Sequence, residues 1–242
     1  MIFQKKAILF IHGFSASYYE NEYFLNSLQK HHELDVYTFT LPGHERPLMR
    51  KVKYEEWIER SEKEFLNLTK HYHQIYLVGH SMGGVIASYL ASKYPDFAKR
   101  LILIAPAFEY GSFEQNKKDL KRFFSPKEKT ERLGYDTFLS KLIQIPTKDF
   151  LEFTKLVKNY KSTIQKVTIP TLIIHGDEDN IVPFTASTYA YKNVKAKEKY
   201  ITTLKGIRHQ VFISDKKREV SEYIYLFTKF HFSFRKKYIK EI

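Results

Sequence analysis

A serine stands between two glycines at positions 79–83, in the pentapeptide Gly-His-Ser-Met-Gly, with an apolar run at 75–78 before it and a helical pattern after it. A sharp turn from a strand into a helix forces the serine backbone into a strained conformation. Glycines two residues to either side remove the side chains that would clash there. The hydroxyl is then presented at a helix N-terminus, where the helix dipole favours developing negative charge. The pattern therefore predicts Ser81 as a nucleophile.

A nucleophilic serine needs a general base, and that base needs a carboxylate to orient it. His209 follows the strand-like run 199–203, in a loop before the last helical pattern. A cluster of acids follows the strand-like run 171–174, at the carboxyl end of a strand, where open α/β sheets bind their ligands. This order of serine, acid and histidine suits a nucleophile on such a turn, so we interpret His209 as the base. Three acids compete for the orienting role, and each could instead stabilise a turn or cap a helix: Asp177, Glu178 and Asp179.

The negative oxygen of an acyl-transfer intermediate needs two backbone N–H donors. One donor is expected from Met82, the residue after the nucleophile, and the other from the loop after the first strand. That loop begins His12-Gly13-Phe14, so Phe14 is the expected second donor. His12-Gly13 is equally compatible with a plain tight turn leaving a strand.

Strand-like runs recur along the chain, and several are continuously apolar rather than alternating. Continuous apolar runs are typical of strands covered on both faces, as in a parallel sheet. Helical patterns lie between them at 54–68, 81–94 and 220–227. Strand alternating with helix predicts an α/β fold with a mainly parallel sheet. The expected strands are 7–11, 34–40, 75–78, 101–104, 171–174 and 199–203.

One region interrupts this alternation, because residues 107–167 contain no convincing strand. Helical segments fit there instead, separated by Ser-Pro and Ile-Pro pairs. We interpret 107–167 as a helical cap inserted between two late strands of a core formed by 1–106 and 168–242. The helices expected in the cap are 114–124, 128–144 and 147–161.

Composition excludes several classes of protein. Hydrophobic residues make up 43% of the 242 residues, which excludes a wholly disordered chain. The absence of cysteine excludes a disulfide scaffold, a thiolate nucleophile and a cysteine-ligated metal site. No apolar stretch is long enough for a membrane span or a signal-peptide core, so we expect a soluble, cytoplasmic protein. The net charge of +13 could attract anionic partners, but we interpret it mainly as a solvated surface.

With these pieces in place, the chain resembles the α/β-hydrolases of the serine esterase and lipase type. It is most similar to the group of small monoacylglycerol lipases, lysophospholipases and carboxylesterases with a helical cap. The resemblance implies that Asp179, three residues after Gly176, is the catalytic acid, with Asp177 as the remaining alternative. The matching segments span nearly the whole chain: 12–14, 41–44 (Leu-Pro-Gly-His), 79–83, 176–183 and 206–209.

The activity expected is cleavage of a carboxylic ester through an acyl-enzyme, with no metal or organic cofactor. The substrate expected is a small-molecule ester with a medium or longer acyl chain, such as a monoglyceride-like lipid, since acyl pockets are mostly apolar. We expect no nucleic acid partner, and weak association with an acidic membrane surface is a further possibility. Apolar cap residues could line the pocket or pack the cap onto the core; the candidates are Phe113, Phe123, Phe138 and Phe150.

Other functions fit the same pattern. The fold also carries thioesterases, and the segments 12–14 and 41–44 resemble those of a lyase of menaquinone synthesis as well. A panel of p-nitrophenyl esters and acyl-CoA thioesters separates these activities. From a different class, the basic charge and the Arg235-Lys-Lys tail would suit a binding protein on a retired hydrolase scaffold. That alternative predicts salt-dependent retention on nucleic acid and no labelling of Ser81.

Overall fold

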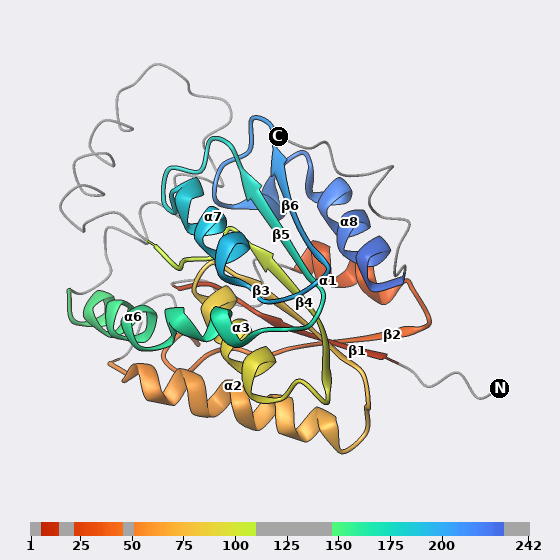
Figure 1. Ribbon diagram of the computed structural model, residues 1–242, viewed down its shortest axis with the longest axis horizontal. Helices are drawn as coiled ribbons and strands as arrows, with labels where there is room; N and C mark the ends of the chain where they lie inside the picture. Colours follow the sequence, from red (N-terminus) through yellow and green to blue (C-terminus); the bar gives the residue numbers. More distant parts are fainter. Residues whose placement is uncertain (1–5, 15–21, 46–50, 110–146, 230–242) are drawn as a thin grey trace.

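A six-stranded parallel sheet forms the centre of the computed structural model, which describes residues 6–14, 22–45, 51–109 and 147–229 (Figure 1). The strands lie in the order β2-β1-β3-β4-β5-β6, and every neighbouring pair is parallel. The predicted fold class is confirmed. The strands are β1 (Lys6–Ile11), β2 (Leu34–Thr38), β3 (Ile75–His80), β4 (Ala98–Ile104), β5 (Thr171–Gly176) and β6 (Lys199–Leu204).

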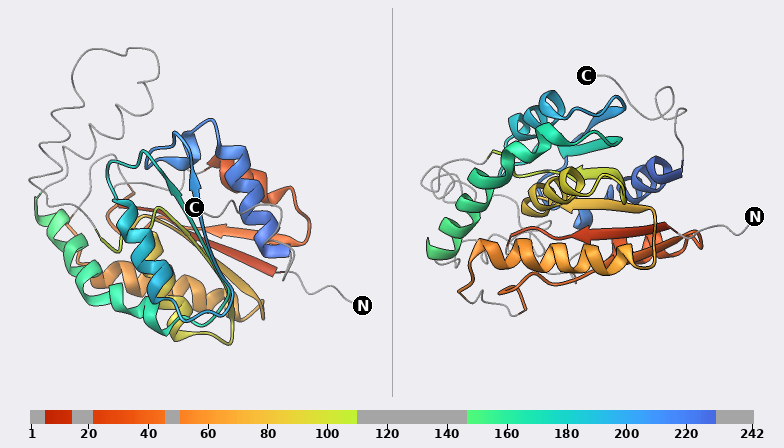
Figure 2. Two further views of the ribbon diagram at one scale, coloured as in Figure 1. Left: turned by 45° about the horizontal axis from the view of Figure 1, so that its top comes forward. Right: turned by 60° about the horizontal axis from the view of Figure 1, so that its bottom comes forward.

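Helices cover both faces of this sheet. Side chains of successive strand residues point to opposite faces, so each apolar run serves two cores at once. In β1, for example, Leu9 belongs to the core shared with α2, α3, α6 and α7, whereas Phe10 belongs to the core shared with α1 and α8. The left view of Figure 2 shows these two sets of helices on opposite sides of the sheet. This arrangement explains why the runs lack polar alternation. The helices are α1 (Glu22–Gln29), α2 (Tyr54–Thr69), α3 (Met82–Lys93), α6 (Thr147–Tyr160), α7 (Phe184–Asn193) and α8 (Lys217–Lys229), with 3₁₀ turns η2 (Lys161–Lys166) and η3 (Val211–Ile213).

The strand order reverses between β1 and β3. From β1 the chain moves outward to β2, and it then returns to the other side of β1 to form β3. Ligands of open α/β sheets bind at the carboxyl ends of the strands that flank such a switch point. Gly13 follows β1 and Ser81 follows β3, so both expected site segments lie at this place.

The region interpreted as a cap, 107–167, is described only at 107–109 and 147–167. Its third expected helix, 147–161, is present as α6, which packs on α2 and α3. Glu152 of α6 accepts the backbone N–H of Tyr54 at 3.2 Å, and the Tyr160 ring packs edge-on against that of Tyr89 at 4.9 Å. The other two helices lie outside the described residues, as do Phe113, Phe123 and Phe138. The division into core and cap therefore stays a prediction.

Two helices were not anticipated from the sequence. Both α1 and α7 are short, and α7 (FTASTYAYKN) carries threonine, tyrosine and asparagine, which have modest helix propensity. Packing of Ala186 and Ala190 against the core stabilises α7 instead. Within the described residues, no helix has both the length and the apolar character that a bilayer crossing requires.

Candidate active site

Ser81 occupies a strained turn between β3 and α3. Its backbone has φ 53° and ψ −119°, a conformation that residues with side chains rarely adopt. The turn is held on both sides, because the Ser81 N–H donates to the Ile104 carbonyl at 2.9 Å and the Ser81 carbonyl accepts the Ala107 N–H at 3.1 Å. Ser81 is only 8% exposed, so the residue is recessed from the open surface.

The glycines around Ser81 permit close backbone approach. A Cβ on Gly79 would lie 2.3 Å from the carbonyl oxygen of Gly83, and a Cβ on Gly83 would lie 2.1 Å from that of Ile11. Neither contact can exist, and both involve backbone atoms that cannot rotate away. The second of them brings the start of α3 directly against the end of β1. This is the steric reason for glycine on both sides of the serine.

Gly83→Ala is therefore expected to destabilise the fold by ~3 kcal/mol, because β1 and α3 must separate to admit the methyl group. Gly206→Ala is the matched control. Nothing lies within 4 Å of a Cβ on Gly206, so only its φ of +72° opposes the change, and the cost should be ~1 kcal/mol. Urea unfolding measures both. Equal losses for the two variants would contradict the steric account.

The loop after β1 lies beside the nucleophile. A Cβ on Gly13 would be 3.0 Å from the Cβ of Ser81, so the backbone leading into Phe14 passes directly next to the serine. Met82 is the first residue of α3, and the N–H groups of a helix's first turn have no acceptor within the helix. The two expected oxyanion donors thus belong to segments that meet at Ser81.

His12 ties that loop to the next one. Its Nε2 accepts the backbone N–H of Leu41 at 2.9 Å, and its Nδ1 donates to the Gly13 carbonyl at 2.8 Å. The ring must be neutral to do both. Burial, together with the neighbouring His44 and His80, lowers the pKa of His12 to about 3. The sequence indicated an oxyanion loop or a plain tight turn here, but not this link, since Leu41 is 29 residues away.

An aromatic cluster covers Phe14. We define it as Phe14, His44, Trp57, Phe150 and Phe153. Phe153 of α6 stacks on Phe14 with ring centroids 5.3 Å apart, and Trp57 meets Phe14 edge-on at 5.9 Å. Trp57 Nε1 also donates to the Pro42 carbonyl at 2.9 Å, which fixes the loop at 41–44. Phe150, a predicted pocket residue, is half-buried and contacts Phe153 at 5.7 Å.

Asp179 and His209 are in direct contact. His209 Nδ1 lies 2.7 Å from Asp179 Oδ2, and both side chains are almost fully buried, at 2% and 1% exposure. The other carboxylate oxygen, Oδ1, accepts the backbone N–H groups of Ile181 and Val182, each at 2.9 Å. Burial opposes ionisation of Asp179, but the electrostatic attraction and hydrogen bonds of the His209 and His175 rings outweigh it. The pKa of this carboxyl is therefore well below its ordinary value.

The competing acids have other partners. Asp177 is exposed, and its Oδ1 accepts the backbone N–H of Gly206 at 2.6 Å. Glu178 is also exposed, with its carboxylate 4.0 Å from Arg208. Asp179 thus contacts His209, while Asp177 acts as a turn residue that joins the loops after β5 and β6.

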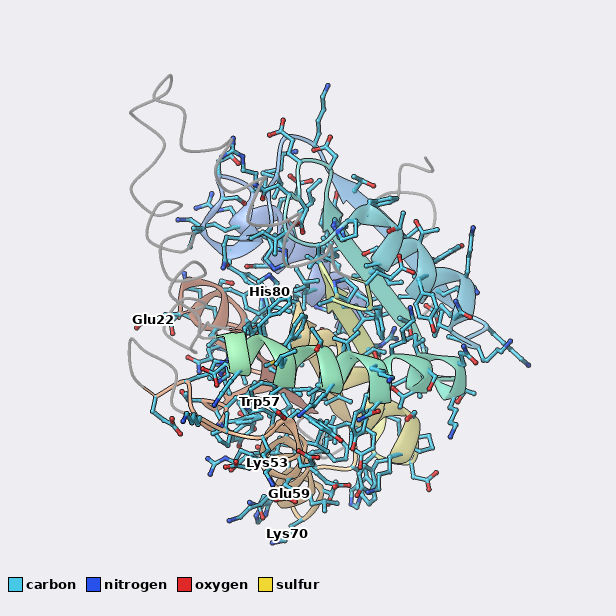
Figure 3. The ribbon with its side chains drawn as sticks, turned by 90° about the vertical axis from the view of Figure 1, so that its left-hand side faces the viewer. Glu22, Lys53, Trp57, Glu59, Lys70 and His80 are labelled. Carbon is cyan, nitrogen blue, oxygen red and sulfur yellow. The ribbon has the colours of Figure 1, made fainter. Side chains whose placement is uncertain are left out.

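His80 connects the serine turn to the histidine loop. Its Nε2 donates to the backbone carbonyl of His209 at 3.1 Å, and the two imidazole rings lie 5.0 Å apart. Burial, followed by the influence of His209, lowers the pKa of His80 to about 3. In Figure 3, α6 crosses the front of the molecule, with His80 above it and Trp57 below it. No sequence pattern indicated this link, which joins residues 129 positions apart.

Within the described part of the chain, no group of three or more histidine or carboxylate side chains is arranged to hold a metal ion. The site combines a strained serine with a buried imidazole–carboxylate pair.

Comparison with known families agrees with this arrangement. Residues 4–217 match the model of a hydrolase family described as serine aminopeptidase, S33. The chain belongs to this family. The predicted hydrolase class and the resemblance to α/β-hydrolases are thereby confirmed.

Curated relatives of this S33 family member include lipases. A thermostable monoacylglycerol lipase of Bacillus sp. (strain H-257) is 24% identical over 217 residues, which cover 84% of this chain and 82% of the relative. Monoacylglycerol lipase ABHD6 of Bos taurus is 26% identical over 234 residues, covering 78% and 66% of the two chains.

Solved structures share the fold. The monoacylglycerol lipase of Paleococcus ferrophilus superposes with a TM-score of 0.70 at 19% identity, over 91% of this chain and 93% of its own. A structure from work on the metagenome-derived lipolytic enzymes LipS and LipT reaches a TM-score of 0.76, also at 19% identity, over 94% and 95% of the two chains.

Proposed function

We propose that this S33 family member hydrolyses carboxylic esters, with Ser81 as nucleophile, His209 as general base and Asp179 as the acid that orients it. The observation that carries the proposal is the buried pair of His209 and Asp179 next to the strained turn of Ser81, joined to it through His80. Because Nδ1 of His209 is engaged with Asp179, Nε2 is the ring nitrogen that would accept the serine proton.

In the first half of the reaction, Ser81 Oγ attacks the ester carbonyl carbon while His209 takes its proton. The carbonyl oxygen becomes negative and accepts hydrogen bonds from the N–H groups of Phe14 and Met82, each worth about 10²–10³ in rate. The tetrahedral intermediate then collapses. The carbon–oxygen bond to the alcohol breaks, the alcohol leaves with the proton from His209, and the acyl group stays on Ser81.

In the second half, water attacks the acyl-enzyme. His209 takes a proton from the water as its oxygen bonds to the acyl carbon, and the same N–H donors stabilise the second tetrahedral intermediate. The bond to Ser81 Oγ then breaks, Ser81 recovers its proton from His209, and the carboxylic acid leaves. Asp179 keeps its negative charge throughout and stabilises the imidazolium that forms in each half.

The substrate class that we propose is a medium-chain or longer acyl ester of the monoglyceride type. The aromatic cluster, with Phe150 half-buried at its edge, makes the surroundings of Phe14 mainly apolar, which suits an acyl chain better than a charged group. The names of the two curated relatives, both monoacylglycerol lipases, support the same class. Cytoplasmic location and weak association with an acidic membrane surface stay predictions.

A fluorophosphonate probe tests the mechanism, since it phosphonylates only an activated serine. We expect mass spectrometry to locate one adduct, on Ser81, and expect Ser81→Ala to abolish both labelling and hydrolysis of p-nitrophenyl esters. Ser88→Ala is a matched control, because Ser88 is a buried serine of the same helix whose hydroxyl donates to the Gly84 carbonyl. Folded wild-type protein that is neither labelled nor active would sink the proposal.

A further inference from the structure

A second imidazole lies against Asp179. His175, near the end of β5, is completely buried, and its Nε2 is 3.3 Å from Asp179 Oδ2. The same Nε2 is 3.1 Å from the Val182 carbonyl, and Nδ1 is 2.7 Å from the hydroxyl of Ser187 on α7. None of these contacts has a part in the mechanism described above.

The partners of His175 determine where its hydrogen lies. The Val182 carbonyl and the Asp179 carboxylate can only accept, so Nε2 must carry the hydrogen that both of them share. In this tautomer Nδ1 is an acceptor, and the Ser187 hydroxyl is the donor that fills it. Ser187 is itself completely buried. A chain of hydrogen bonds therefore runs from Ser187 through His175 to Asp179.

We propose that His175 is a positioning residue for the catalytic acid, which it holds through Nε2–H while Ser187 fixes its tautomer. This inference rests on the proposed function, in which Asp179 orients His209. A fully buried histidine lowers the stability of the fold unless its ring nitrogens have hydrogen-bond partners, whereas an apolar residue at the same position would not. Here Nε2 of His175 has two acceptors, the Asp179 carboxylate and the Val182 carbonyl.

His175 is expected to act in two ways. It restrains the rotation of Asp179, whose Oδ1 is already held by the N–H groups of Ile181 and Val182. Its Nε2–H also partly offsets the negative charge of Asp179 at Oδ2, the oxygen that faces His209. Without His175, Asp179 would be less well oriented and its charge would act more strongly on His209, favouring the protonated imidazole.

Among the described residues, charged and titratable groups near His209 come from several elements. Asp179 and His175 belong to β5 and the loop after it, and His80 lies at the end of β3. Arg208 precedes His209 and faces Glu178 from the exposed side of the loop. His175 is the buried member of this set whose printed contact to the pair runs through Asp179 Oδ2, the oxygen that His209 also approaches.

His175→Phe tests the proposal, because phenylalanine keeps the ring shape that packs edge-on against Phe184 but removes the donor. We expect kcat on a p-nitrophenyl ester to fall about tenfold with KM nearly unchanged. The acid limb of the profile of kcat/KM against pH should move to higher pH by about half a unit. His175→Gln can present an N–H near the position of Nε2. It should therefore recover most of kcat and return the acid limb of the kcat/KM profile to its wild-type pH.

Ser187→Ala provides a second route that leaves His175 in place. It should lower kcat by a few-fold and shift the acid limb in the same direction, since His175 loses the donor that fixes its tautomer. Ser221→Ala is the matched control, a buried hydroxyl on α8 that donates to the Lys217 carbonyl and should change nothing. Each rate is divided by the concentration of active sites, measured as the amount of Ser81 that the fluorophosphonate labels. Unfolded protein is therefore left out of kcat.

The outcomes separate the two proposals. An unlabelled, inactive wild type overturns the proposed function itself. An active wild type with unchanged kcat and acid limb in His175→Phe overturns the role of His175 alone. If His175→Phe does not fold, Ser187→Ala decides: a shift relative to Ser221→Ala supports the role, and equal profiles overturn it. Failure of His175→Gln to recover any activity in folded protein also contradicts it, since the donor would then not be what matters.

Discussion

Replacing Asp179 with asparagine is expected to lower kcat about 10⁴-fold while leaving the protein folded. An amide has one acceptor and one donor end, whereas Asp179 is surrounded by donors. Ile181 and Val182 donate to Oδ1, and His209 and His175 approach Oδ2. In either orientation the amide NH₂ must face a donor. If it faces His209, the imidazole must take the wrong tautomer, and Nε2 can no longer accept the serine proton.

Asp177→Asn is the matched control for this prediction. Asp177 lies two residues earlier in the same turn, and its single oxygen contact, with the Gly206 N–H at 2.6 Å, can be made equally by an amide oxygen. We expect its kcat to stay within about threefold of the wild type. Steady-state kinetics on one ester, with circular dichroism to establish folding, measure both variants. A large loss in Asp177→Asn with activity kept in Asp179→Asn would reverse the assignment of the acid.

Stability should fall steeply as the solution becomes mildly acidic. Burial is the main cause that lowers the pKa of His12 and His80 to about 3 and that of His44 to about 4, from an ordinary value of 6.5. Within the described residues, His80 Nδ1 and His44 Nε2 have no hydrogen-bond partner, so a proton added there would be buried without an acceptor. These rings stay neutral in the folded protein but gain protons once it unfolds.

The direction of the effect follows from proton uptake on unfolding. The stabilising contribution of these histidines is complete above about pH 6.5, and it is lost as the pH falls toward their folded pKa values of about 4 and 3. In that window each histidine lowers the free energy of unfolding by up to ~1.4 kcal/mol for each pH unit of acidification. The three together therefore lower it by up to ~4 kcal/mol per unit. Since domains are typically stable by only about 5–15 kcal/mol, we expect unfolding before pH 4.

Urea unfolding at intervals between pH 7 and pH 5 measures this slope. His44→Asn keeps a donor near the position of Nδ1 for the Pro42 carbonyl but cannot titrate, so it should reduce the slope by about one third. His71→Asn, at an exposed histidine after α2, should leave the slope unchanged. A free energy of unfolding that is flat from pH 7 to pH 5 would mean that the buried rings accept protons without cost.

The elements of the fold were largely predictable because they depend on local composition. Six strand-like runs, several of them continuously apolar, predicted a mainly parallel sheet, since a strand covered on both faces has no solvent side for polar residues. The glycines flanking Ser81 predicted a strained turn, and the structure has φ 53° there. In contrast, α7 is helical through packing and not through propensity, so local composition did not indicate it.

The sequence by itself determined the parallel α/β fold, the strained turn at Ser81 and the order in which serine, acid and histidine follow one another. The family resemblance implied Asp179 as the acid, but only the tertiary structure decided which of three neighbouring acids faces His209, because the direction of a side chain in a turn depends on its hydrogen-bond partners. Oδ1 of Asp179 is held by two nearby N–H groups, which directs Oδ2 at the histidine. The tertiary structure also assigned partners to the buried histidines. Their ring nitrogens bind groups up to 129 residues away, and no local pattern records such a distance.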